Sequence, residues 1–213
     1  PLTAVTNGSI DMGSTEIIGA SERALADLRG RYVGAVFQNP AASLNPVMTV
    51  GAQIMEVLKI HHPEQSTAQL EARVDEMMEL VGIPAKRKVE YPHQFSGGMK
   101  QRIVIAIALA CEPKLILADE PTTALDVTIQ AQILQLLKEM QVKYNLTIVL
   151  ITHDLGVVAN IADRVAVMYA GDIVEIGTSD EIYYDPRHPY TWALLSSMPQ
   201  MGVKGEDLFN IQG

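Results

Sequence analysis

Helix and strand patterns alternate between residues 97 and 151, and this alternation constrains the fold more than any other feature of the sequence. Apolar strands are predicted at residues 115–118 and 147–151, and each follows a helix, at residues 98–110 and 127–144. Strands that are almost continuously apolar are typical of parallel sheets buried on both faces. The sequence therefore predicts an α/β fold with a parallel sheet covered by helices on both faces.

The segments before this core differ in character. Residues 9–12 and 32–37 are strand-like and lie on either side of a probable helix near residues 22–29. Residues 41–95 are predicted to be mainly helical, with Pro residues between the helical segments. In that region apolar side chains recur at helical spacing, at Leu70, Val74, Met77, Met78 and Val81. Gly82 is well placed to end this helix.

The segments after the core are short. Residues 165–169 and 173–176 are predicted to form a hairpin, joined through Ala170-Gly171-Asp172. Short helices are expected near residues 180–184 and 190–197.

Composition limits the classes of function. The 213 residues are 48% hydrophobic and 19% charged, as in a globular protein, and the net charge of -9 argues against a nucleic-acid partner. The single cysteine, Cys111, excludes an internal disulfide framework and is expected to be a buried, inert thiol. The longest apolar stretch, residues 103–111, is shorter than the roughly 20 residues that a membrane-spanning helix needs. The chain begins at Pro1 without a Met or a leader pattern, and we expect it to be a fragment.

Polar side chains follow both core strands at their carboxyl ends, where ligands gather in open parallel sheets. The first strand delivers Asp119 and Glu120, and the second delivers Thr152, His153 and Asp154. Of two adjacent carboxylates, one can hold Mg²⁺ while the other orients or deprotonates a water; by position we assign Asp119 to the metal and Glu120 to the water. The structural alternative is that Asp119 or Glu120 caps the next helix and Asp154 the one after it.

An anion-binding turn is predicted upstream, at Ser96-Gly97-Gly98. Ser96 is a good N-cap, and two glycines allow backbone N–H groups to approach an anion at the start of a helix. Lys100 and Arg102 are expected in the first turn, where the helix dipole disfavours cations and a docked anion would offset that cost. The alternative is an ordinary turn with solvated cations.

These segments resemble the motifs of ABC-transporter ATPase domains, in the same order and with the same spacing. Phe95-Ser96-Gly97-Gly98-Met99 resembles the signature motif, and residues 115–120 resemble the Walker B strand. Ala124-Leu125-Asp126 is similar to the D-loop, His153 to the switch histidine and Gln38 to the Q-loop glutamine. The resemblance covers essentially the whole chain and implies a P-loop NTPase-like parallel sheet with an inserted α-helical subdomain.

The resemblance also implies roles for the matching residues. Glu120 would be the catalytic carboxylate, His153 would contact the γ-phosphate of ATP, and Gln38 would touch the Mg²⁺ or the attacking water and sense the membrane partner. The turn at Ser96, Gly97 and Gly98 would bind the γ-phosphate of ATP held by a second ATPase subunit. Asp126 would lie at the interface of that head-to-tail dimer.

Two departures from the family pattern stand out. Phe95 and Met99 occupy positions where many members carry Leu and Gln, although the Ser-Gly-Gly core is intact. No Gly-x-x-x-x-Gly-Lys-[Ser/Thr] Walker A loop occurs anywhere in the 213 residues. By this comparison the loop would lie upstream of Pro1, and we expect the chain alone neither to bind ATP well nor to hydrolyse it.

Two further segments resemble the oligopeptide and dipeptide branch of the importers, whose nearest relatives move nickel. They are residues 36–46 and residues 188–195. The resemblance implies transmembrane permease subunits as partners, an indirect periplasmic or lipid-anchored peptide-binding protein, and a peripheral position on the cytoplasmic face of the inner membrane. Some members carry an iron–sulfur cluster in a C-terminal extension, but Cys111 lies upstream of that region and no cluster is expected in this chain.

The resemblance suggests four parts. Residues 1–40 would be part of the ATPase core ending in the Q-loop, residues 41–95 the helical subdomain, residues 96–178 the signature helix with the rest of the core, and residues 179–213 the start of the C-terminal extension. Two alternatives remain: a non-transport ABC-type ATPase, and a non-catalytic interaction or regulatory module. The first usually carries long coiled coils or a second ATPase domain, and neither is present.

Overall fold

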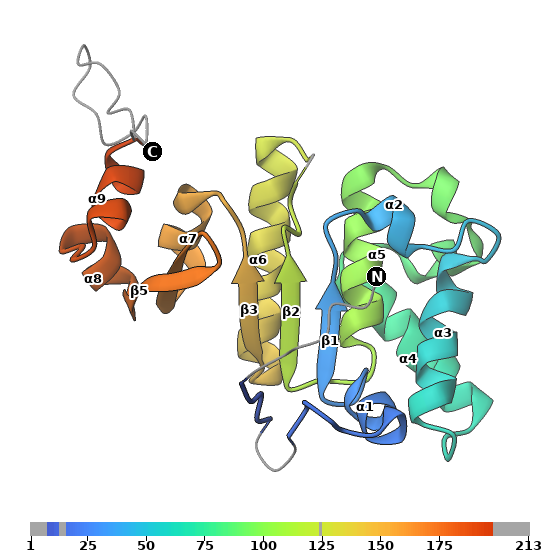
Figure 1. The fold of residues 1–213 in the computed structure, drawn as a ribbon. Coiled ribbons are helices and arrows are strands. Elements are labelled where there is room, and N and C mark those ends of the chain that lie inside the picture. The colour runs from blue at the N-terminus through green and yellow to red at the C-terminus, as the bar shows by residue number, and fades with distance from the viewer. Residues whose placement is uncertain (1–7, 13–15, 124, 198–213) are drawn as a thin grey trace. The chain divides into compact units, whose positions relative to one another are not determined.

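A parallel three-stranded sheet lies at the centre of the first of two units that make up the chain (Figure 1). The structure is a computed structural model that describes residues 8–12, 16–123 and 125–197. The units comprise Pro1–Ile151 and Thr152–Gly213, and each is described by itself.

The sheet has the strand order β1-β2-β3, with both neighbouring pairs parallel. Its strands are β1 (Val33–Val36), β2 (Leu115–Asp119) and β3 (Thr147–Ile151). The register places Ala35 beside Leu117 and Leu117 beside Val149. The predicted parallel sheet is thus confirmed, and all three strands end at the same edge.

The two faces of the sheet differ, which corrects the expectation that both are covered. Ile116 and Ala118 are buried on one face, against helices of the core. On the other face Leu117 and Val149 are 39% and 45% exposed among the described residues. Because successive strand residues point to opposite faces, an apolar strand can be covered on one side and open on the other.

A block of helices connects β1 to β2. It contains α2 (Pro40–Ser43), α3 (Val50–His61), α4 (Thr67–Leu80), the 3₁₀ turns η1 (Ala85–Val89) and η2 (Pro92–Gln94), and α5 (Gly97–Leu109). The α5 helix packs directly on β1, since a methyl group at Gly34 would lie 2.5 Å from the carbonyl oxygen of Ala108. Residues 41–95 are thus mainly helical, as the sequence predicts.

Two predicted helical faces are buried in the core. In α4 the apolar residues are buried, and the chain leaves that helix through Gly82 with a φ of +75°, a conformation that favours glycine. The α6 helix (Val127–Tyr144) joins β2 to β3 and is drawn behind the sheet in Figure 1. Its buried side chains are Ile133, Leu136, Leu137 and Met140. Periodicity therefore locates both helices correctly.

The N-terminal prediction is only partly right. The helix near residues 22–29 is present as α1 (Glu22–Leu28), with Ser21 as its N-cap. The predicted strand at residues 9–12 is wrong, because only an isolated bridge pairs Asp11 with Glu16 there. The described residues of this segment are largely exposed and bury too little apolar surface to hold a ladder.

The second unit contains the predicted hairpin. Strands β4 (Arg164–Tyr169) and β5 (Asp172–Thr178) pair antiparallel, and Ala170 and Gly171 both have positive φ, as tight hairpin turns require. Three short helices complete this unit: α7 (Leu155–Ile161), α8 (Ser179–Tyr184) and α9 (Pro189–Ser196). None of the helices in the described part of the chain combines the length and the hydropathy that crossing a membrane demands.

Candidate functional site

A hydrogen-bonded group lies where β1 and β2 end. Gln38 follows β1 by two residues, and its Nε2 donates to Oε2 of Glu120 over 2.7 Å. The Thr123 hydroxyl donates to the same carboxylate oxygen over 2.8 Å. The parallel register brings these residues together, although 82 positions separate Gln38 from Glu120 in the sequence. We call Gln38, Asp119, Glu120 and Thr123 the strand-end cluster.

The backbone of Glu120 has an unusual conformation. Its φ is +44°, in the left-handed region that costs a residue with a side chain roughly 1–2 kcal/mol. The Glu120 N–H donates to the Ile151 carbonyl over 2.9 Å, which fixes the residue to the end of β3. Neither Asp119 nor Glu120 caps the following helix, because Asp126 has that position. The capping alternative is therefore wrong for this pair.

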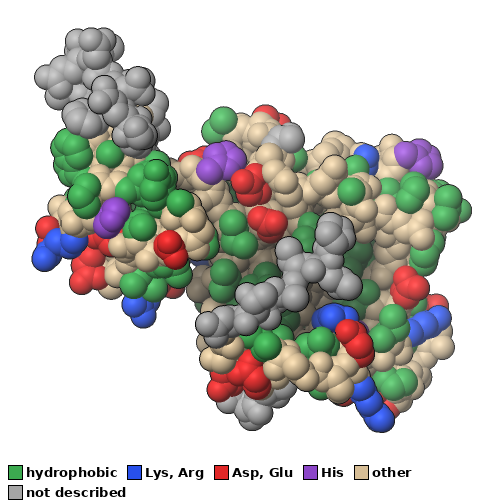
Figure 2. Space-filling model, in the orientation of Figure 1, with side chains coloured by type: hydrophobic (Ala, Val, Ile, Leu, Met, Phe, Trp, Pro, Cys, Tyr) green, Lys and Arg blue, Asp and Glu red, His purple; other side chains and the backbone are tan. Residues whose placement is uncertain are grey.

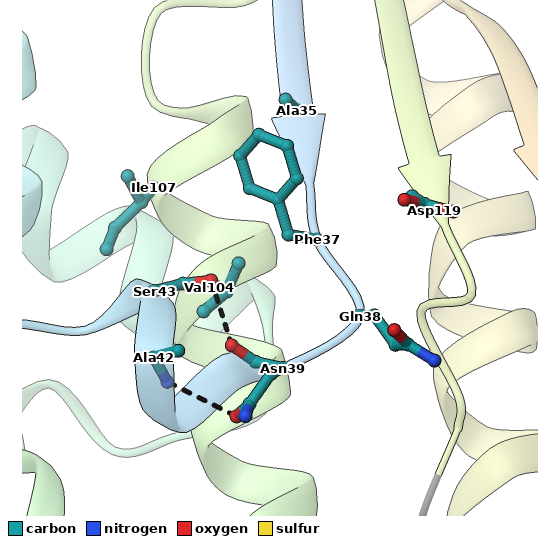
Figure 3. Close-up of a pocket in the computed structure, with 9 residues that line it drawn as sticks. All are labelled: Ala35, Phe37, Gln38, Asn39, Ala42, Ser43, Val104, Ile107 and Asp119. Atoms are coloured by element: carbon teal, nitrogen blue, oxygen red, sulfur yellow. Dashed lines mark hydrogen bonds between the residues drawn. The ribbon is translucent and has the colours of Figure 1, made fainter. Parts of the chain in front are cut away.

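Asp119 lies beside an open cavity of about 560 Å³. Figure 3 shows Gln38 and Asp119 on neighbouring strand ends, with Phe37 beside them. Carboxylate and amide oxygens suit Mg²⁺, which usually takes few protein ligands and completes its shell with water and phosphate oxygens. Among the described residues no group of three His, Cys, Asp or Glu side chains could hold a metal. Asp119 and the side-chain amide of Gln38 both line this cavity, and each carries an oxygen of the kind that Mg²⁺ takes as a ligand.

Asn39 fixes the direction in which the chain leaves the Gln38 loop. Its side-chain oxygen accepts hydrogen bonds from the N–H groups of Ala41 and Ala42, at 3.0 and 3.2 Å, and so caps α2. Figure 3 shows the bond from Ala42. The sequence analysis missed this role. The signal was present, because Asn followed directly by Pro is a favourable helix start.

The turn at Ser96-Gly97-Gly98, which the sequence predicts to bind an anion, lies at the start of α5. Ser96 is the N-cap, and its hydroxyl oxygen accepts from the Met99 N–H at 3.4 Å. Ser96 and Gly97 are exposed, so the start of this 13-residue helix is accessible, and the first N–H groups of a helix have no partner within it. A helix N-terminus with this exposure is suited to binding an anion.

The second glycine of this turn also has a packing role. A methyl group at Gly98 would lie 2.5 Å from Cγ2 of Ile129 in α6, whereas one at Gly97 would make an ordinary contact with Leu125 at 3.6 Å. Because a 2.5 Å approach cannot be accommodated without movement, Gly98 allows the turn to pack against the start of α6. The two glycines are therefore not equivalent.

The expectation for Arg102 is wrong. Since α5 begins at Gly97, Arg102 lies in its second turn, and it donates to the Val81 carbonyl at 2.9 Å and to Gln132 at 3.1 Å. These contacts tie α5 to the end of α4 and to α6. Arg102 is neither a first-turn cation nor a solvated one.

Two predicted acidic residues act as helix caps. Asp126 caps α6 by accepting from the Ile129 N–H at 3.0 Å, and Ala124 of the predicted D-loop lies outside the described residues. Asp154 caps α7 through the Val157 N–H at 3.1 Å, as the structural alternative expected. His153 belongs to the second unit, and it is therefore not placed relative to the strand-end cluster.

Cys111 is the buried thiol that the sequence predicts. It is 8% exposed, and burial raises the pKa of its thiol to about 11. A thiol with so high a pKa carries little of the reactive thiolate near neutral pH.

Comparison with known proteins identifies the family. Residues 2–123 match the family described as "ABC transporter", and residues 174–213 match the "Oligopeptide/dipeptide transporter, C-terminal region". The chain resembles the oligopeptide transport ATP-binding protein OppD of Bacillus subtilis, with 58% identity over 94% of the chain and 56% of the relative. It is also 54% identical to the oligopeptide transport ATP-binding protein AmiE of Streptococcus pneumoniae, over 97% of the chain and 60% of the relative.

A dipeptide relative and two solved structures agree with this. The dipeptide transport ATP-binding protein DppD of Bacillus subtilis is 52% identical over 98% of the chain and 63% of the relative, so the chain spans less than two thirds of these curated relatives. The dimeric ATP-binding cassette MJ0796, bound to ADP and Pi in a post-hydrolysis state, aligns with a TM-score of 0.73 and 28% identity over 82% of the chain and 74% of its own length. CbiO1 from Clostridium perfringens, part of the ABC transporter complex cbiONQ, aligns with a TM-score of 0.69 and 32% identity over 78% of the chain and 64% of its own length. The chain belongs to the ABC transporter family.

Proposed function

We propose that the chain is the ATP-binding and ATP-hydrolysing part of an ABC importer for oligopeptides or dipeptides. The observation that carries this proposal is the bond of 2.7 Å between Gln38 and Glu120 at the edge of the sheet. It joins the residue expected to sense the membrane partner to the residue expected to activate water. Gln38 and Asp119 also line one cavity, which supports a metal site formed by these two residues.

The chemistry of the strand-end cluster follows from its hydrogen bonds. Gln38 and Thr123 both donate to Oε2 of Glu120, so they restrict the rotation of its carboxylate. A carboxylate fixed in this way can accept a proton from an attacking water and orient it, which contributes roughly 10²–10⁴-fold in rate. Bound Mg²⁺, held by Asp119 and Gln38 together with the nucleotide, would neutralise charge on the phosphates. Positioning and electrostatics supply most of the catalysis in phosphoryl transfer.

The remaining predicted residues are proposed to act together with a partner ATPase subunit, or they lie in the unit Thr152–Gly213 of this chain. The turn at Ser96, Gly97 and Gly98 is proposed to bind the γ-phosphate of ATP held by another ATPase subunit, either a second copy or a paralogue. The exposed start of α5 supports this, because the first N–H groups of a helix have no partner within the helix. Asp126 is proposed to lie at that interface, and His153 to contact the γ-phosphate of its own subunit's ATP.

The transport role is supported by the printed names of the relatives and by the match to the C-terminal region of oligopeptide and dipeptide transporters. We propose transmembrane permease subunits as direct partners and a periplasmic or lipid-anchored peptide-binding protein as an indirect one. The protein would be attached peripherally to the cytoplasmic face of the membrane. The net charge is -9, and on the face drawn in Figure 2 the Lys and Arg side chains are scattered among carboxylates.

Two measurements test the proposal. The protein as its gene encodes it should hydrolyse ATP in a Mg²⁺-dependent way, and deletion of the gene should abolish uptake of labelled short peptides. Absence of both activities would favour a non-catalytic interaction module. The 213-residue chain alone, which has no Walker A loop, should neither bind nor hydrolyse ATP; tight binding in a Mg-ATP titration would show that the nucleotide site is elsewhere.

A further inference from the structure

Arg87 in η1 makes contacts with both sides of the anion-binding turn. Its Nη2 donates to the Gln94 carbonyl over 3.3 Å, and its Nη1 contacts Sδ of Met99 at 3.7 Å. Its guanidinium carbon lies 4.3 Å from the ring centroid of Phe95. Gln94 and Phe95 precede Ser96, and Met99 follows Gly98, so one side chain touches the chain before and after the turn.

Apart from the packing of Gly98 on Ile129, the described residues place few restraints on the turn. Ser96 and Gly97 are exposed, and the capping bond to Ser96 is long at 3.4 Å. Glycines have no side chain to hold them in place and lose much conformational freedom when they are ordered. Phe95, in contrast, is only 5% exposed and lies under the Arg87 guanidinium. The position of the turn therefore depends on its flanking residues.

Arg87 itself is held firmly by Glu90. Its Nε donates to both oxygens of that carboxylate, at 2.9 and 3.0 Å, and its Nη2 donates at 2.6 Å. The hydrogen bonds from Arg87 lower the pKa of Glu90, so the pair stays charged near neutral pH. Because the guanidinium is planar and forked, it can bind a carboxylate and stack on a ring at the same time.

The 3₁₀ helix η1, which carries Arg87, is itself fixed to the helices around it. The Val50 N–H of α3 donates to the Glu90 carbonyl over 2.9 Å, and a methyl group at Gly51 would lie 2.7 Å from Cβ of Lys88. Lys88 also pairs with Asp75 of α4 at 2.5 Å. Arg87 thus contacts the residues that flank the Ser96-Gly97-Gly98 turn from an element that α3 and α4 hold in place.

We propose that Arg87 is a positioning residue that holds the Ser96-Gly97-Gly98 turn in the geometry needed to bind a phosphate. This inference rests on the proposed function, in which the turn binds the nucleotide of a second subunit. Arg87 does not itself touch the phosphate in this proposal. It acts through Gln94, Phe95 and Met99.

The test uses the gene-encoded protein with its partner ATPase and compares four variants. Arg87→Ala removes every contact, Arg87→Lys keeps the charge but loses the fork, and Glu90→Gln keeps Arg87 on the turn but removes the ion pair. Lys86→Ala is the matched control, because Lys86 is an exposed cation of the same 3₁₀ turn. Amide hydrogen exchange of a peptide covering residues 95–100 is measured against one covering residues 147–151, together with the KM for ATP and ATP binding by the isolated subunit.

Arg87→Ala should speed exchange at residues 95–100 by at least about tenfold while residues 147–151 exchange as in the wild type. It should also raise the KM for ATP and leave ATP binding by the isolated subunit unchanged. Arg87→Lys should recover only part of the protection, and Glu90→Gln should have a smaller effect than Arg87→Ala. Lys86→Ala should match the wild type.

Unchanged exchange at residues 95–100 in Arg87→Ala would overturn the inference. Equal effects of Arg87→Ala and Glu90→Gln would also overturn it, because the ion pair alone would then explain the result. Faster exchange in both peptides would mean that Arg87 only stabilises the fold. If the wild type does not hydrolyse ATP, the proposed function fails, and the exchange comparison still decides the role of Arg87.

Discussion

The strand-end cluster and the turn at Ser96-Gly97-Gly98 are held in opposite ways. Glu120 accepts hydrogen bonds from Gln38 and Thr123, and its own N–H is bonded to β3. The turn is exposed, and it is restrained by the contacts of Arg87 with its flanking residues and by the packing of Gly98 on Ile129. The Glu120 carboxylate and N–H are hydrogen-bonded within the chain, whereas the turn lies at the exposed start of a helix.

This difference suggests how one chain could act on its own nucleotide and also contact the nucleotide of a partner chain. Groups that act on a bound nucleotide of the same chain can be fixed by their neighbours before it binds, which reduces the cost of reorganisation during the reaction. Groups that act on a nucleotide of another chain have to remain accessible until the two chains meet. The proposed division of labour therefore assigns the cluster to its own ATP and the turn to the ATP of a partner.

The largest expected effect comes from Glu120→Gln in the gene-encoded protein. The amide keeps the shape of the side chain but cannot accept a proton from water, so hydrolysis should fall roughly 10²–10⁴-fold while ATP binding is retained. Rates are measured from phosphate release and affinity from equilibrium binding. Turnover close to that of the wild type would remove Glu120 from its proposed role and leave the cluster without a base.

The next largest effect should be on the turn, through Gly98→Ala. The added methyl group would clash with Ile129, which should cost about 1–3 kcal/mol in the free energy of unfolding. Adding Ile129→Ala should recover part of that loss, because it removes the clashing atom, and the two changes should be strongly non-additive. Chemical denaturation measures all four proteins of the cycle.

Gly97→Ala is the matched control for that cycle. A methyl group there meets only an ordinary contact with Leu125, so the free energy of unfolding should change by less than about 1 kcal/mol. A similar loss in Gly97→Ala and Gly98→Ala, or no recovery with Ile129→Ala, would show that Gly98 has no special packing role.

A smaller effect is expected for Thr123→Val, which keeps the shape of the side chain and removes its bond to Glu120. The loss of one hydrogen bond of about 1 kcal/mol should lower kcat several-fold. Thr147→Val, at an exposed position of β3, is the control and should have no effect on kcat. An unchanged kcat in Thr123→Val would show that Gln38 alone positions the carboxylate.

The smallest effect should be at Cys111, which lies outside both the cluster and the turn. With its pKa raised from 9.0 to about 11, its thiolate fraction near pH 8 should be about a hundredfold below that of a free thiol, and alkylation by iodoacetamide should be correspondingly slow. Because its folded pKa is the higher one, the stability that this thiol contributes is complete below pH 9 and is lost as the pH rises towards 11. Faster alkylation in any variant above would show that the variant loosens the fold.

The sequence predicted most of the regular structure because periodicity reports which side of an element is apolar. The long helix at residues 127–144 and the strand at residues 147–151 have the predicted bounds. Periodicity does not report what covers an apolar side, and the exposed positions of Leu117 and Val149 were therefore missed. The strand expected at residues 9–12 failed for a related reason, since strand-like residues without a buried partner do not hold a ladder.

The candidate site was predictable to the extent that strand ends and helix starts mark it. Asp119, Glu120 and Ser96 follow from such local signals, and the resemblance to the family located Gln38. Thr123, Asn39 and Arg87 were missed because their contacts depend on how separate segments pack. Arg102 was misjudged for the same reason, as its partners are Val81 and Gln132.

One measurement tests the central claim directly, that the cluster and the turn act on nucleotides of different chains. The Glu120→Gln protein is mixed with its partner ATPase and Mg-ATP, and the mass of the complex and the bound ATP per subunit are measured with and without a second change, Gly97→Asp. Because Gly97 has room for a side chain and faces outward, the added carboxylate should repel the partner's phosphate without unfolding the turn. The account predicts that the dimer is lost while each subunit keeps its ATP. Loss of bound ATP from the Gly97→Asp subunit itself would contradict it.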